Sequence, residues 1–257
     1  MPLEFVGKSL ALGHAGVDAT TASLGVAAAE LWTLMTVETA GCGFLPDRRA
    51  PIRYERHIFH RLTGGRFDDG DISDPSPGGY GPGGAPQYTR LAKAIALDRA
   101  AALKSTSWGL GQIMGENCSV AGFGDVASMV DAMSASEDAQ LAAIGAFLKS
   151  SRLDEALRRH DWTTLAKGYN GPSYQKNQYD TRLAAAYQKL AAGSVPDLNV
   201  RTAQLYLTYR GFNPGPVDGM MGLRTRQAIA AFQASRGLPA TGLPDEDLLV
   251  ALQPAAN

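Results

Sequence analysis

Apolar residues recur at three- and four-residue spacing through most of the chain between residues 15 and 195. This spacing is the period of an α-helix that buries one face. The pattern is clearest in five stretches, residues 27–37, 88–104, 126–150, 153–169 and 179–193. It predicts a mainly α-helical region that buries these faces against one another.

One segment interrupts the helical period. Residues 50–62, APIRYERHIFHRL, mix β-branched and aromatic side chains with charges in near alternation, which predicts a short strand or extended turn. Residues 64–87 follow and are dense in Gly, Pro and Asp, which predicts a long exposed loop. A loop of that length inside a compact domain is typically functional or disordered.

The pattern changes again near residue 195. Residues 191–199, AAGSVPDLN, are typical of a short linker. Two short amphipathic stretches follow, residues 201–211 and 224–237, each ending in a glycine as helices commonly do. A turn, NPGPVDGMMG, separates them. The chain therefore divides into a large helical region and a small C-terminal unit.

Charge and hydropathy narrow the classes of partner. The chain carries 24 basic and 25 acidic residues, a net charge of −1, which favours neither a nucleic-acid nor a membrane-surface partner. No apolar run approaches the roughly 18 residues that a transmembrane helix requires. The N-terminal stretch contains Glu4 and a short, interrupted apolar run, which does not match a signal peptide. We therefore expect synthesis in the cytoplasm.

The two cysteines, Cys42 and Cys118, form no CxxC motif and no metal-ligand pattern. We expect both to be free thiols. A disulfide would require the two glycine-rich loops that carry them to meet, and the sequence leaves that pairing open.

Glu38 ends an apolar helical run and precedes Gly41 and Gly43, which stop the helix. The C-terminal end of a helix dipole disfavours an anion, and apolar neighbours raise the pKa of a carboxyl group. Both effects favour a carboxyl group that keeps its proton near neutral pH, as a general acid must. On local sequence alone, a solvated glutamate in the last helical turn is the favoured interpretation.

Two further motifs combine small, polar and aromatic residues. Residues 105–117, STSWGLGQIMGEN, contain small residues that let backbones approach closely, and amide side chains suited to sugar hydroxyls and amides. Residues 167–180, KGYNGPSYQKNQYD, interrupt a helical region with Tyr169, Asn170 and Gly171. Either motif alone is typical of a packed turn.

Together, and in this order, these three motifs resemble the lysozyme-like superfamily of goose-type lysozymes and lytic transglycosylases. A closer resemblance, over residues 5–192, is to the N-acetylmuramidase family of phage endolysins. It is carried by VETAGCGF, RYERHIFHRL, GGYG, SWGLGQIMG, DWTTLAKGYNGPSY and YDTRLAAAY. The resemblance implies that Glu38 is the catalytic acid. It also implies a sugar groove lined by Ser107, Trp108, Gln112, Tyr169 and Asn170. Cys42 departs from the small polar residue more usual at its position.

A muramidase reaction that uses water calls for a second carboxylate. Glu55, on the extended segment after the Glu38 helix, is the first candidate. The alternative is that Glu55 forms a buried ion pair with Arg53, Arg56 or His57. Weaker candidates for the second carboxylate are Asp69, Asp71 and Asp74 on the polar loop. His57 and His60 could bind a metal only if their segment were helical, and we favour hydrogen bonding to Glu55 instead.

The C-terminal unit resembles the peptidoglycan-binding domain of cell-wall hydrolases. The features that carry this resemblance are Gln204, Leu207, Arg210-Gly211-Phe212, Val217-Asp218-Gly219, Gly222, Thr225, Ala228, Phe232-Gln233, Gly237-Leu238, Thr241-Gly242 and Leu248. Met221-Gly222-Leu223 departs from the aromatic, glycine and proline more frequent there. The resemblance implies a small three-helix domain that binds peptidoglycan.

These features predict a mainly α protein with two domains. Residues 1–192 form a lysozyme-like catalytic domain with a short extended segment, residues 193–198 a linker, and residues 199–257 the peptidoglycan-binding domain. The resemblance implies a phage endolysin that hydrolyses the β-1,4 bond between N-acetylmuramic acid and N-acetylglucosamine, without cofactor or metal. We expect a monomer, made in the host cytoplasm, that reaches the wall with the help of a holin. A lytic transglycosylase and a non-catalytic wall-binding phage protein are the alternatives.

Overall fold

The computed structural model describes residues 3–38, 41–67, 69–171, 174–193 and 195–253, with the side chain of Glu38 left out. The helices before residue 193 are α1 (His14–Leu24), α2 (Ala28–Glu38), α3 (Arg56–Leu62), α4 (Pro86–Leu97), α5 (Arg99–Lys104), α6 (Val126–Ala135), α7 (Glu137–Ser150), α8 (Asp154–Arg158), α9 (Trp162–Asn170) and α10 (Tyr179–Ala192), with 3-10 turns at Gly115–Asn117 and Tyr174–Asn177. The later helices are α11 (Leu198–Tyr209), α12 (Leu223–Ser235) and α13 (Glu246–Leu252). The predicted mainly α fold is confirmed.

Three of the predicted helical stretches are each divided into two helices. The divisions fall at Asp98, Ser136 and Asp161, which are the N-caps of α5, α7 and α9. Each cap side chain accepts a backbone N–H from the first turn of the helix that follows it. Such a bond satisfies an amide that would otherwise lack a partner, and it stabilises a new helix start although the apolar period continues.

Helix α2 is buried along most of its length, with Leu31, Leu34, Met35 and Val37 in the core. It packs mainly against α10. Glu38 is its last residue. The predicted setting of Glu38, at the end of a buried helix, is therefore confirmed for the backbone.

Three short strands, β1 (Ile52–Tyr54), β2 (Thr106–Trp108) and β3 (Ile113–Met114), form an antiparallel sheet in the order β1-β2-β3. The prediction of extended structure over residues 50–62 is correct only for β1, because α3 follows at once. In β1 the burial alternates with the pleat of a strand, whereas α3 buries Phe59 on one face. Basic residues in the last turn of α3 further stabilise its C-terminal end.

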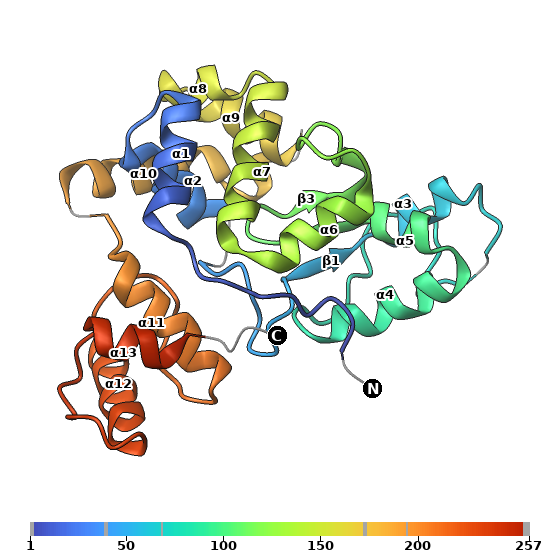
Figure 1. The fold of residues 1–257 in the computed structure, drawn as a ribbon. Coiled ribbons are helices and arrows are strands. Elements are labelled where there is room, and N and C mark those ends of the chain that lie inside the picture. The colour runs from blue at the N-terminus through green and yellow to red at the C-terminus, as the bar shows by residue number, and fades with distance from the viewer. Residues whose placement is uncertain (1–2, 39–40, 68, 172–173, 194, 254–257) are drawn as a thin grey trace.

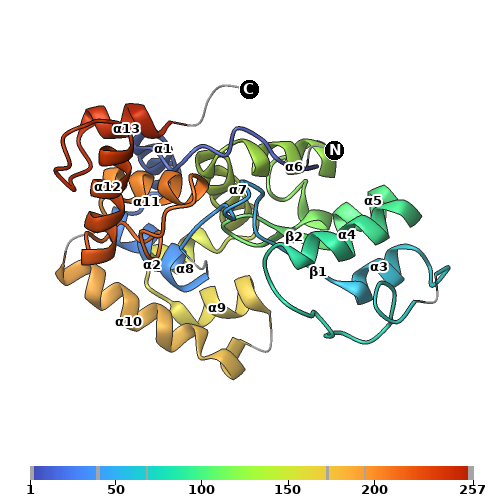
Figure 2. The same cartoon turned by 90° about the horizontal axis from the view of Figure 1, so that it is seen from below.

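The long loop between α3 and α4 is irregular, as predicted, but residues beneath it fix its course. Gln87 Nε2 donates to the Tyr80 carbonyl over 2.6 Å, and Arg90 Nη1 donates to the same carbonyl over 2.9 Å. The Tyr54 hydroxyl donates to the carbonyl of Ile72, which is fully buried. The loop is therefore anchored at both Ile72 and Tyr80. Figure 2 places it at the end of the molecule opposite α11, α12 and α13.

Helices α11, α12 and α13 form a separate group (Figure 1) with its own hydrophobic core. The predicted linker, residues 193–198, begins directly after α10 and overlaps the first residue of α11, Leu198. Phe44, from the segment after α2, is buried in the core of this C-terminal group. A large aromatic side chain from the N-terminal region thus completes the second core.

Further bonds join the two groups. The backbone N–H of Ala11 donates to the Tyr206 hydroxyl over 3.0 Å, and the Tyr209 hydroxyl donates to the Ser9 carbonyl over 3.0 Å. The N-terminal segment therefore lies against α11. Within the ranges given above, none of the helices combines the length and apolar character that crossing a bilayer demands.

Because Phe44 is buried in the second core, we expect Phe44→Ala to lower the free energy of unfolding by about 3–5 kcal/mol. Chemical denaturation measures this loss. The control is Leu243→Ala, at a side chain that is 47% exposed in the same C-terminal group, which should change stability by less than about 0.5 kcal/mol. Equal effects of the two substitutions would show that Phe44 does not contribute to that core.

Candidate active site

A cavity of about 490 Å³ opens between the sheet, the long loop and the segment after α2. It is lined by Cys42, Pro51, Ile52, Arg53, Tyr80, Gly81, Gly83, Gly84, Gln87, Gly109, Leu110 and Gln112. Most of these residues are polar or expose backbone, which suits a ligand rich in hydroxyl and amide groups. We call this cavity the groove.

Glu38 lies close to one wall of the groove along the chain. Its side chain is outside the described part of the structure, but α2 ends at Glu38 and Cys42, four positions later, lines the groove. Gly41 lies between them with φ of 84°, a left-handed conformation that favours glycine. Gly41 therefore adopts a turn conformation directly before the groove residue Cys42.

Glu55 lies directly after β1, whose residues Ile52 and Arg53 line the groove. Its backbone N–H donates to the Ser105 carbonyl over 2.9 Å. The side chain is 13% exposed, and the side chain of Tyr80, a groove residue, interacts with its carboxylate. Glu55 is thus connected to the groove through Tyr80.

Burial raises the pKa of Glu55 above its ordinary value, although the charges of Arg53 and Arg90 and the bond from Tyr80 act in the opposite direction. Of the three ion-pair partners considered for Glu55, His57 lies within 4 Å of the carboxylate, with its Nδ1 3.4 Å from Oε2. Burial and the nearby charge of Arg61 lower the pKa of His57, which keeps this imidazole neutral near pH 7. A neutral partner does not hold Glu55 in the charged form.

The two arginines considered as partners of Glu55 make other contacts. Arg56 Nη1 donates to the Gly70 carbonyl over 2.6 Å and lies 3.4 Å from a carboxylate oxygen of Asp74. The Arg53 guanidinium lies over the Tyr80 ring, 5.2 Å from its centroid. Arg53 thus stays close enough to influence the Glu55 carboxylate electrostatically without forming a direct ion pair with it.

The three aspartates of the long loop serve its own structure. Asp71 pairs with Arg90 and Lys93, and Asp74 pairs with Arg56. Asp69 accepts the backbone N–H of Asp71 over 3.0 Å. These contacts leave Glu55 as the better placed candidate for a second carboxylate.

Ser107 and Gln112 form one hydrogen-bonded unit at the β2–β3 turn. The Ser107 hydroxyl donates to Gln112 Oε1 over 3.2 Å, and Gln112 Nε2 donates to the carbonyls of Pro51 and Gly109. Gln112 has φ of 47°, so this network also holds a backbone conformation that non-glycine residues rarely adopt. Gln112 lines the groove, whereas Ser107 is buried and supports that lining through its bond to Gln112.

The remaining predicted groove residues differ in position. Trp108 is 0% exposed and its indole Nε1 donates to the Leu103 carbonyl over 3.1 Å, so it supports the sheet from the core and presents no surface to the groove. The Tyr169 hydroxyl donates to the Gly111 carbonyl over 2.9 Å, which ties α9 to the β2–β3 turn. Asn170 is the last residue of α9.

Cys42 and Cys118 are both free thiols, as predicted. Burial, reinforced by the nearby Glu137 carboxylate, raises the pKa of Cys42 to about 12, so its thiol stays protonated and unreactive. His57 and His60 do lie on a helix, but His60 Nδ1 is 3.1 Å from the Ser73 hydroxyl. Among the described residues, no group of three or more potential ligands could hold a metal ion.

Sequence reasoning did not select Arg53, Tyr80 and Gln87 as site residues. Tyr80 belongs to the GGYG motif, where a single aromatic residue between glycines was the available signal. Gln87 connects the loop to the sheet, because its Oε1 accepts the Tyr54 backbone N–H over 3.1 Å. That contact joins residues 33 positions apart, which local patterns do not reveal.

A model of the N-acetylmuramidase family matches residues 27–191. The chain belongs to this family. A peptidoglycan-binding domain model matches residues 196–252. Both matches confirm the resemblances found in the sequence, and with them the expected enzyme class, a glycoside hydrolase of the muramidase type.

One solved structure with a similar fold is the crystal structure of the Burkholderia AP3 phage endolysin. Its TM-score is 0.65 at 38% sequence identity, over 70% of this chain and 71% of that one. The localization factor PodJL of two Caulobacter vibrioides strains is 38% identical over 69 residues, which is 27% of this chain. The chain spans only 7% of the length of PodJL.

Because the pKa of Glu55 is raised, the free energy of unfolding of the protein should depend on pH in a specific way. A carboxyl group whose pKa is raised on folding contributes stability below its unfolded pKa, here 4.5, and this contribution is lost as the pH rises through the folded pKa. We expect Glu55→Gln to lose less stability than the parent protein over this interval. Urea denaturation at a series of pH values from 4 to 7 measures the difference. Parallel curves for the two proteins would contradict the raised pKa.

Proposed function

We propose that the protein hydrolyses the β-1,4 bond between N-acetylmuramic acid and N-acetylglucosamine in bacterial peptidoglycan and thereby lyses the cell that produces it. The observation that carries this proposal is the groove itself. The groove is lined by Cys42, four positions after the end of the helix that carries Glu38, and by Tyr80, which interacts with the largely buried side chain of Glu55. This proximity along the chain supports the proposal that the two glutamates act on a sugar chain bound in the groove.

In this proposal Glu38 is the general acid. Breaking the glycosidic bond requires protonation of the leaving oxygen while an oxocarbenium-like charge develops on the sugar. The backbone of Glu38 ends a buried helix, where the helix dipole disfavours a negative charge. That position favours the protonated carboxyl group that donates to the leaving oxygen.

Glu55 is the second carboxylate and activates the attacking water. A general base is most effective when its pKa is near the working pH, and burial moves the pKa of Glu55 in that direction. The bond from Tyr80 and the charge of Arg53 oppose this shift and keep the ionised form accessible. The same positive charge near the groove attracts the anionic groups of peptidoglycan.

Two other functions make different demands on this site. A lytic transglycosylase needs one acid, because the 6-hydroxyl of the muramic acid itself attacks and gives a 1,6-anhydro product. A non-catalytic wall-binding phage protein needs neither carboxyl group. The largely buried side chain of Glu55 near the groove favours the hydrolase over both, and a turbidity assay on purified peptidoglycan separates the non-catalytic alternative.

The C-terminal domain would keep the enzyme on its polymeric substrate, since a tethered binding module raises the effective concentration of substrate at the active site. We propose that a monomer is made in the host cytoplasm and reaches the wall after a holin permeabilises the membrane. Residues 1–192 and 199–257 remain our proposed catalytic and binding domains, joined by residues 193–198.

Glu38→Gln should fold as the parent protein does but lower the rate of peptidoglycan cleavage by about 10²–10⁴-fold, because the amide keeps the shape and removes the transferable proton. The loss of turbidity of purified peptidoglycan measures the rate, and thermal unfolding checks the fold. Activity above a tenth of the parent value would exclude Glu38 as the acid.

The products should carry free reducing N-acetylmuramic acid ends, which mass spectrometry of digested peptidoglycan detects. Glu55→Gln should lower the hydrolytic rate by about 10²-fold or more without lowering the melting temperature, because it removes the base and also a buried charge. 1,6-anhydro ends as the main product would replace the hydrolase proposal with the transglycosylase. A Glu55→Gln variant that stays active would exclude Glu55 as the base.

A further inference from the structure

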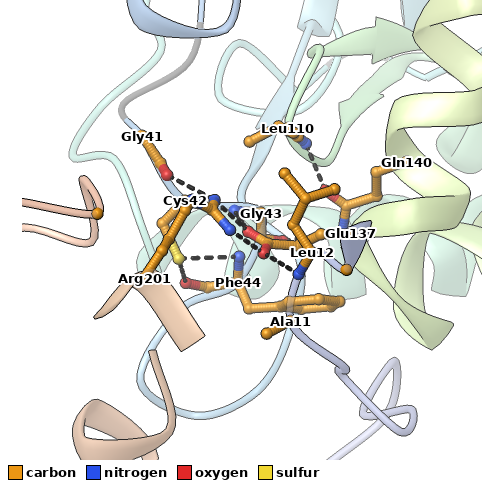
Figure 3. Close-up of polar contacts among 12 residues, drawn as sticks. Ala11, Leu12, Gly41, Cys42, Gly43, Phe44, Leu110, Glu137, Gln140 and Arg201 are labelled. Carbon is orange, nitrogen blue, oxygen red and sulfur yellow. Dashed lines mark hydrogen bonds and ion pairs between the residues drawn. The ribbon is translucent and has the colours of Figure 1, made fainter. Parts of the chain in front are cut away.

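A buried carboxylate outside the groove connects three parts of the chain (Figure 3). Glu137, the first residue of α7, is 0% exposed. Its two oxygens accept the backbone N–H groups of Leu12 over 2.9 Å and Gly43 over 2.7 Å. They also accept two N–H groups of Arg201, one of them over 2.7 Å. Every one of these donors is far from Glu137 in the sequence.

Arg201 belongs to α11 of the C-terminal domain and is 1% exposed. Besides its two bonds to Glu137, its Nη2 donates to the carbonyl of Gly41 over 2.7 Å. Burial alone would lower the pKa of Arg201, but the charge of Glu137, the hydrogen bonds to it and the nearby Cys42 and Tyr209 together raise it. Arg201 therefore stays charged inside the protein and reaches the segment that follows the Glu38 helix.

The segment held by this ion pair is a wall of the groove. Arg201 fixes the Gly41 carbonyl and Glu137 fixes the Gly43 N–H, on either side of the groove residue Cys42. Gln140, one turn along α7, donates to the Gly43 carbonyl over 2.9 Å and accepts the backbone N–H of Leu110 over 2.6 Å. Leu110 also lines the groove. Gln140 therefore connects the segment around Cys42 with the part of the lining that contains Leu110.

Close packing leaves this segment little freedom. A Cβ on Gly43 would lie 2.3 Å from Gln140 Oε1 and 2.9 Å from Glu137 Cγ. A Cβ on Gly41, which has φ of 84°, would lie 3.2 Å from the carbonyl oxygen of Val217 in the C-terminal domain. The C-terminal domain thus contacts the groove wall at Val217 as well as at Arg201.

We propose that Arg201 is a positioning residue for the muramidase reaction, through which the C-terminal domain holds the groove wall that follows Glu38 in its active conformation. This inference rests on the proposed function of Glu38. A C-terminal domain that only binds the bacterial cell wall would need no charged residue buried against the catalytic domain. A buried ion pair also contributes little net stability compared with apolar residues of similar size. The Glu137–Arg201 pair therefore matters more for positioning the groove wall than for stability.

The test separates positioning from stability and from adhesion. Arg201→Met removes the three bonds and leaves the Glu137 charge unpaired. The double variant Arg201→Met, Glu137→Gln also removes that charge, and Arg201→Lys keeps the charge but cannot reproduce the planar fork. The matched control is Arg210→Met, because Arg210 donates to the carbonyls of Ala251 and Gln253 within the C-terminal domain. Each variant is made in the full chain.

Four quantities are measured for each variant: kcat and KM on soluble muropeptide oligomers, sedimentation with purified sacculi, and melting temperature. We expect the double variant to melt above Arg201→Met, while both lose kcat by about 10–100-fold, as small displacements in an active site do. Arg201→Lys should lose kcat by about tenfold at a melting temperature near that of the parent. Sacculus binding should stay within about twofold throughout, and Arg210→Met should retain the parent kcat.

A double variant or Arg201→Lys that keeps the parent kcat would overturn the proposal and leave Arg201 with a structural role alone. A loss confined to sacculus binding would overturn it as well. Failure of the underlying function is distinguishable, because it appears in Glu38→Gln, which retains Arg201 and Glu137. If that variant remains active while the Arg201 variants lose kcat, the segment is important but Glu38 is not the acid.

Discussion

The arrangement of the molecule depends on the buried ion pair between Glu137 and Arg201. A carboxylate with no access to water is costly unless charged or N–H donors surround it, and Glu137 receives donors from Arg201 and from the backbones of Leu12 and Gly43. Satisfying this one group therefore brings together the N-terminal segment, the groove wall and the C-terminal domain. The two domains are in this sense one structural unit, although their sequences match separate families.

In the proposed function, the carboxyl groups of Glu38 and Glu55 take different roles because their surroundings differ. Glu38 ends a helix whose dipole acts on it, whereas Glu55 follows a strand and is surrounded by Tyr80, His57 and two arginines. Burial and positive charge act on the Glu55 pKa in opposite directions. The balance between them suits a group that exchanges a proton during turnover.

Patterns within a few residues predicted most of the helices, the end of α2 at Glu38, the strand before Glu55 and the irregular long loop, because each depends on local periodicity or turn residues. They did not predict the breaks at Asp98 and Ser136, where a cap interrupts a continuing apolar period. Trp108 was expected in the groove but lies in the core, since the residue type alone does not fix the direction of a side chain. Local patterns did not predict the buried ion pair of Glu137, because its partner Arg201 is 64 positions away.

The contacts of the N-terminal segment with α11 affect the order in which the protein folds during synthesis. The bond between Ala11 and Tyr206 spans 195 positions, so one partner is synthesised long before the other. Glu137 likewise emerges before the arginine that neutralises it. Domains generally fold in order of synthesis, and contacts distant in sequence form late. The nascent muramidase domain thus emerges with its groove wall held at Gly43 by Glu137 and Gln140, and the Gly41 carbonyl gains its bond from Arg201 only after α11 has left the ribosome.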